Sequence, residues 1–146
     1  MEAVLRSRPA CGGLPVAYSA YFDCFNAGEY YEAHDVLEHL WLGCSTPDAG
    51  FYKGLIQIAG AFVHLKKQFE RPLHPKDGRR LHPAVRLFAL GTANIEPFAP
   101  RHLGLDVTEL VATCRSLANQ IQTSGFTKNP WSPDHLPTIP LEKPTP

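Results

Sequence analysis

His34 and Glu38 stand four positions apart in a segment whose apolar residues have helical spacing. At about 100° per residue, the two side chains fall about 40° apart on one helix face. That face also carries Tyr30, Leu37 and Trp41, so the two polar residues interrupt an otherwise apolar stripe. A histidine and a glutamate placed in this way can ligate one cation or exchange a proton with a substrate.

Gln57 and His64 share one face of the next helical segment, together with small residues such as Gly60. Small residues let another helix approach closely, and a short connection makes consecutive helices antiparallel neighbours. We therefore expect Gln57 and His64 to face His34 and Glu38 across a shared helix interface.

One interpretation of this cluster is a metal site. His34, Glu38 and His64 would provide two imidazoles and one carboxylate, which leaves coordination positions open for water or substrate. Gln57 would be a fourth ligand or would orient the others. A zinc, manganese or iron ion held there would lower the pKa of a bound water and so support hydrolysis.

Two other interpretations use the same residues without a metal. The four polar side chains could satisfy one another and fix helix packing, because an unpaired buried polar group costs about 1–3 kcal/mol. The protein would then be a non-enzymatic structural or interaction module. Alternatively, His34, Glu38, Gln57 and His64 could line a small-molecule pocket with Trp41. Residue types and spacing leave the choice between an enzyme and a non-enzymatic module open.

The elements that carry these residues are helices. Helical spacing or helix-boundary residues mark five segments, at about 15–26, 29–42, 51–69, 83–98 and 106–123. Gly28 suits a left-handed helix end, and Asp106 with Glu109 resembles a capping box. No strand-like alternation occurs. We predict an all-α, compact single-domain bundle of about five helices at 15–123, preceded by an N-terminal extension at 1–14.

Residues 124–146 differ in composition, because six of the chain's 14 prolines lie there. Such a segment cannot be helical for long and is either a disordered tail or an extended strap. Its apolar residues Trp131, Leu136, Ile139 and Leu141 favour a strap that lies on the chain's own body or on a neighbour.

Charge and cysteine content narrow the classes of function. Lys plus Arg and Asp plus Glu are 14 each, a balance that argues against nucleic-acid binding and against a membrane surface. The same balance permits a homo-oligomer. No apolar run reaches the roughly 18–20 residues of a membrane span. The four cysteines form no CxxC pair and are expected to be free thiols in the cytoplasm.

Two blocks, residues 25–41 and 51–64, resemble the family called domain of unknown function 309. The first block has the family's HxxxExxW motif as His34, Glu38 and Trp41, and the second has its GLIQ element and the histidine at position 64. The resemblance implies a compact all-α fold and no established activity. It also implies a suggested metal-binding role for the motif. The chain departs from the family's pattern after His64, where a longer proline-rich loop follows.

Overall fold

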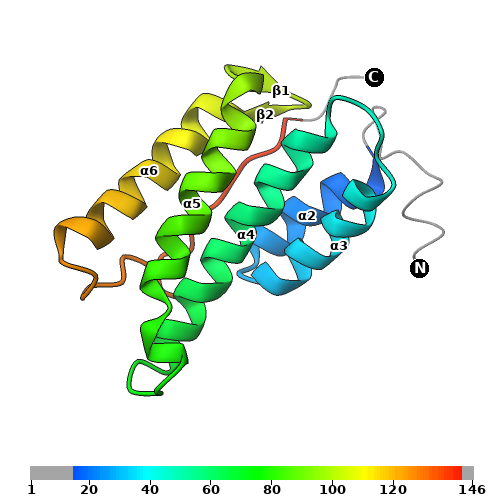
Figure 1. The fold of residues 1–146 in the computed structure, drawn as a ribbon. Helices are drawn as coiled ribbons and strands as arrows, with labels where there is room; N and C mark the ends of the chain where they lie inside the picture. Colours follow the sequence, from blue (N-terminus) through cyan, green and yellow to red (C-terminus); the bar gives the residue numbers. More distant parts are fainter. Residues whose placement is uncertain (1–14, 143–146) are drawn as a thin grey trace.

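The computed structural model describes residues 15–142, and helices dominate this part of the chain (Figure 1). The α-helices are α2 (Val16–Asn26), α3 (Tyr30–Leu42), α4 (Ala49–Glu70), α5 (Leu81–Ile95) and α6 (Val107–Thr123). Two short 3₁₀ helices are η1 (Asp77–Arg79) and η2 (Glu96–Phe98). The expected all-α bundle of about five helices is thereby confirmed. The N-terminal extension expected at 1–14 lies outside the described residues.

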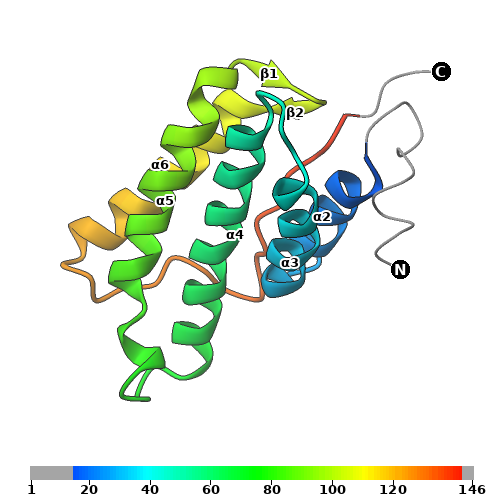
Figure 2. The same cartoon turned by 45° about the vertical axis from the view of Figure 1, so that its right-hand side comes forward.

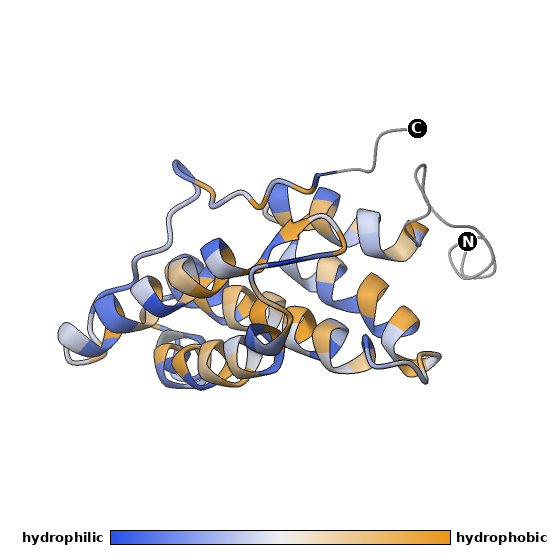
Figure 3. Ribbon diagram, turned by 90° about the horizontal axis from the view of Figure 1, so that it is seen from above, coloured by the Kyte–Doolittle hydropathy of each residue, from blue (hydrophilic) through white to orange (hydrophobic). Residues whose placement is uncertain are grey.

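Helix α4 is the centre of the bundle. It packs against α3 on one side and α5 on the other, while α2 packs on α3 and α6 packs on α5 (Figures 1 and 2). Ten of its 22 residues are buried, which follows from a sequence that is apolar on most faces. Seen from above, apolar residues gather where the helices face one another (Figure 3). The helix that carries Gln57 and His64 therefore has neighbours on two sides.

Two glycines bring α4 and α5 into close contact. A Cβ atom on Gly54 would lie 2.5 Å from Ile95 Cγ2 and 2.8 Å from the Gly91 carbonyl oxygen. A Cβ atom on Gly91 would in turn lie 2.8 Å from the Gly54 carbonyl oxygen. All three distances are shorter than van der Waals contact, so this crossing requires glycine on each helix. The face of α4 that carries small residues such as Gly54 and Gly60 thus packs against α5.

Aromatic rings fill the space around α4. Phe62 makes edge contacts with Phe25 and Phe88, with ring centroids 4.9 and 5.3 Å apart. It also stacks on Tyr30 at 5.1 Å. All four rings are at most 1% exposed, and burying each aromatic side chain contributes about 1.5–3 kcal/mol. This cluster joins α2, α3, α4 and α5 into one core.

A short antiparallel hairpin connects η2 to α6, and the sequence analysis did not predict it. Strands β1 (Arg101–His102) and β2 (Leu105–Asp106) pair with Arg101 opposite Asp106. The turn between them has Leu103 and Gly104 at positive φ, 47° and 77°. Strands of two residues are too short to show alternation, which explains why the pattern search missed them.

Residues 125–142, here called the C-terminal strap, run in an extended course across the bundle (Figures 1 and 2). Trp131 is buried, and its Nε1 donates to the Tyr30 hydroxyl at 2.9 Å. Asn26 holds the backbone of Ile139 twice: its Oδ1 accepts the Ile139 N–H at 2.6 Å, and its Nδ2 donates to the Ile139 carbonyl at 3.0 Å. The strap therefore lies on the body of its own chain.

None of the helices within residues 15–142 combines the length and hydropathy that a membrane crossing needs. Cys24, Cys44 and Cys114 are free thiols. Cys11 lies outside the described residues.

Candidate functional site

His34 and Glu38 lie together on α3, at the edge of its buried face. His34 Nε2 is 3.9 Å from Glu38 Oε2, and the two side chains are 32% and 42% exposed. Ala33 and Leu37, the neighbours that point to the core, are fully buried. The residues of α3 that face the core are Ala33 and Leu37, and His34 and Glu38 lie beside them at the boundary with the solvent.

The His34 imidazole has one nitrogen closed off from water. Its Nδ1 has no hydrogen-bond partner among residues 15–142 and has almost no exposed surface. Asp35 Oδ1 lies 4.0 Å from this Nδ1, and Glu38 Oε2 lies 3.9 Å from the other ring nitrogen, Nε2; both distances are beyond hydrogen-bond distance. The ring stacks on Tyr31 at a centroid distance of 6.3 Å. His34 and Glu38 thus come close without satisfying each other.

Gln57 and His64 are held by α5 and the loop before it. Asn94 Nδ2 donates to Gln57 Oε1 at 2.7 Å, and an Arg80 guanidinium nitrogen pairs with His64 Nδ1 at 3.0 Å. This arrangement corrects the expected one, in which both residues face α3. The cause is the crossing at Gly54, which places the small-residue face of α4 against α5.

Arg80 and Asp77 extend this contact into a buried ion pair. Arg80 Nε donates to Asp77 Oδ1 at 2.7 Å, and Arg71 donates to the other carboxylate oxygen at 3.1 Å. The hydrogen bond from Arg80, with the charges of Arg80, His74 and Arg71, lowers the pKa of the Asp77 carboxyl against the opposing effect of burial. Asp77 is only 7% exposed. The chain of contacts from His64 to Asp77 therefore fastens the loop between α4 and α5 to α4.

Asp77 was not among the candidate residues indicated by the sequence. The available signal was one aspartate between several arginines and a histidine in the loop that follows α4. Such a composition is also typical of a solvated loop, so only the tertiary contact shows that this loop contains a buried aspartate.

The Arg80 contact sets the tautomer of His64, and burial keeps the ring neutral. A guanidinium group only donates hydrogen bonds, so His64 Nδ1 must be the acceptor and the ring proton must be on Nε2. Burial lowers the pKa of His64 to about 4, with the positive charges of Arg80, Lys67 and Arg86 adding to the effect. His64 is therefore neutral at pH 7 in a positively charged neighbourhood.

The residues present do not fit the expected three-ligand metal site. Within residues 15–142, no three His, Cys, Asp or Glu side chains come close enough to hold a metal ion. His64, the intended third ligand, is paired with Arg80, whose positive charge repels a cation. Trp41 is half-buried and packs against the core cluster. The structure thus keeps His34 and Glu38 together and places Gln57 and His64 in contacts of their own.

The structure thus defines a bundle of five α-helices in the described part of the chain. The motif residues lie on two of them, α3 and α4. Residues 18–73 match the model of the family described as Domain of unknown function (DUF309). The match spans α2, α3 and α4, and it confirms the resemblance carried by the two sequence blocks. No curated protein and no solved structure is significantly similar to the chain.

Proposed function

We propose that this protein is a non-enzymatic structural or interaction module of the cytoplasm, in which Gln57 and His64 stabilise helix packing. The observation that carries the proposal is that both side chains have their hydrogen bonds across the α4–α5 contact, to Asn94 and Arg80. Gln57 Oε1 and His64 Nδ1, the two atoms with lone pairs directed at α5 and the loop before it, are thus occupied by protein donors. The free thiols of Cys24, Cys44 and Cys114 suit a reducing compartment.

The energetic role follows from where the hydrogen bonds lie. Gln57, Asn94 and His64 are each only partly exposed. A typical hydrogen bond contributes about 0.5–1.5 kcal/mol, and leaving one partner unpaired in a partly buried place costs about 1–3 kcal/mol. Under the proposal, replacing these residues lowers the stability of the fold, with or without metal.

A double-mutant cycle on Gln57 and Asn94 tests the proposal. We expect Gln57→Ala and Asn94→Ala each to lower the free energy of unfolding, with a coupling energy of about 0.5–1.5 kcal/mol in the cycle. Gln122→Ala, at an exposed position on α6, is the matched control and should leave stability unchanged. Unchanged stability in both single variants would contradict a packing role.

A metal-dependent hydrolase is the second candidate, favoured by one observation. His34 Nε2 and Glu38 Oε2 lie 3.9 Å apart and both side chains are partly exposed, so the two atoms can reach one cation. Elemental analysis of protein purified without a histidine tag, after exposure to zinc, manganese or iron, separates the two candidates. Stoichiometric metal that His34→Ala and Glu38→Ala remove would favour the hydrolase and overturn the non-enzymatic proposal. Protein that takes up none of the three ions removes the second candidate.

A further inference from the structure

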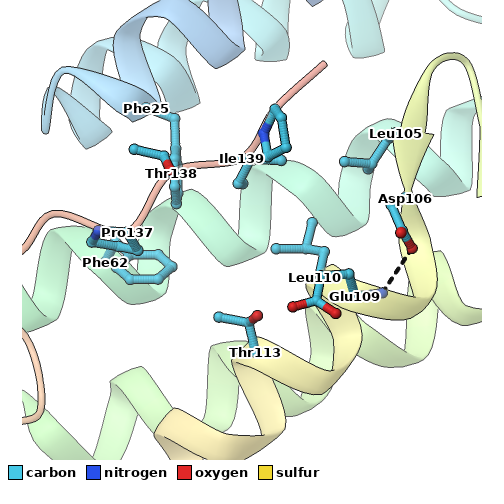
Figure 4. Close-up of a pocket in the computed structure, with 11 residues that line it drawn as sticks. Phe25, Phe62, Leu105, Asp106, Glu109, Leu110, Thr113, Pro137, Thr138 and Ile139 are labelled. Atoms are coloured by element: carbon cyan, nitrogen blue, oxygen red, sulfur yellow. Dashed lines mark hydrogen bonds between the residues drawn. The ribbon is translucent and has the colours of Figure 1, made fainter. Parts of the chain in front are cut away.

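A pocket of about 110 Å³ lies between α6 and the C-terminal strap, away from the HxxxExxW motif. Figure 4 shows Leu110 and its neighbours on α6 opposite residues 137–139 of the strap, with Phe25 and Phe62 nearby. The apolar lining comes from buried residues of five different segments: Phe25, Phe62, Leu105, Leu110 and Ile139. A largely apolar lining with a few polar groups at its edge is typical of small-molecule sites in proteins, and the volume suits only a small ligand or part of a larger one.

The polar edge of the pocket is acidic. Of the described residues, eleven line the pocket, and they include two acids, Asp106 and Glu109, and no base. Glu109 and Thr113 stand four residues apart and so share one face of α6. Their oxygen atoms lie on the α6 side of the opening in Figure 4.

Glu109 is the carboxylate that a ligand can use. Asp106 already caps α6, because its Oδ1 accepts the Glu109 backbone N–H at 3.0 Å, and its Oδ2 lies 3.7 Å from Arg101. The side chain of Glu109 makes no ion pair with any residue in the described part of the chain. The expected capping box is thus only half formed, and the Glu109 carboxylate is left beside the pocket.

The strap holds its wall of the pocket in place before any ligand arrives. The two hydrogen bonds from Asn26 fix Ile139, and the Trp131 indole anchors the strap upstream on Tyr30. Downstream, Leu141 forms a backbone bridge with Leu105. A preformed wall reduces the ordering cost of binding.

We propose that this pocket binds a small organic cation, with an apolar or aromatic body against Phe25, Phe62 and Leu110 and an ammonium group paired with Glu109. The sign of the charge follows from the lining: an anion would meet two carboxylates and no base, whereas an ammonium gains a charge-assisted hydrogen bond. The inference rests on the strap and α6, and it is independent of the function proposed for Gln57 and His64.

Three probes of the same size test both the pocket and its charge preference. 2-Phenylethylamine, 2-phenylethanol and phenylacetate are titrated separately, and the methyl signals of Leu110 and Ile139 are followed by NMR. We expect saturable shifts with the amine, with an affinity about tenfold higher than that of the alcohol, and weaker binding of the anion. Equal or stronger binding of phenylacetate would overturn the proposal, as would the absence of a saturable shift with the amine.

Variants of α6 connect the binding to the named residues. Glu109→Gln, at an exposed position, should reduce amine affinity to that of the alcohol and leave alcohol binding unchanged. Thr113→Phe should fill the pocket and abolish binding of both. Thr108→Phe, on the same helix but outside the lining, is the matched control and should bind like the wild type. An unchanged amine preference in Glu109→Gln would refute the assignment, even if Thr113→Phe did not fold.

Discussion

Acid should destabilise this protein through His64 before it affects the buried carboxylate of Asp77. In the folded protein, burial and nearby positive charges hold the pKa of His64 at about 4, compared with 6.5 for an unperturbed histidine. The unfolded chain therefore binds more protons than the folded chain between these two pH values. Linkage then requires the free energy of unfolding to fall as the pH drops from about 6.5 to 4.

The size of the loss follows from the same shift. A pKa difference of this size corresponds to about 3 kcal/mol for a fully shielded group, and partial solvent exposure of His64 reduces this to about 1.5 kcal/mol. Because the pKa of Asp77 is lowered, its own contribution is lost only at more acidic pH. The two effects therefore occupy different pH windows.

Urea unfolding of the wild type and of His64→Gln, at several pH values between 7 and 4.5, measures this loss. Glutamine can still accept a hydrogen bond from Arg80 but does not titrate, so the difference between the two proteins isolates His64 from the other histidines. We expect the wild-type stability to fall more steeply than that of the variant. Parallel curves for the two proteins would refute the assignment of a strongly lowered pKa to His64.

Three further changes test the packing. Gly54→Ala should destabilise the fold by about 1–3 kcal/mol because its Cβ would collide with α5, while Gly50→Ala in the same helix meets nothing within 4 Å and should cost nothing; thermal melts that shift equally would contradict the close approach. Asn26→Ala should speed amide exchange in the strap around Ile139 far more than in α4, and uniform exchange would argue against local anchoring. Asp106→Ala should lower stability by about 1 kcal/mol through loss of the α6 cap, and Asp106→Asn should retain most of it.

The sequence by itself was sufficient for the elements and for several of their ends. Apolar spacing and helix-boundary residues placed the five helices to within a few residues of their observed bounds. Gly28 has the expected positive φ, and Asp106 caps α6 as expected. These features depend on contacts within one or two turns of the chain, so local residue types determine them.

The partners of the polar residues were decided by tertiary structure. Periodicity shows which side of its own helix Gln57 or His64 occupies, but it does not show which neighbouring helix meets that side. Because Gly54 and Gly91 let α4 and α5 come into close contact, this face of α4 packs against α5. His64 therefore pairs with Arg80 instead of approaching His34. The pocket beneath the strap needs residues from α2, α4, α6 and the strap, and spacing along the chain carries no information about such distant contacts.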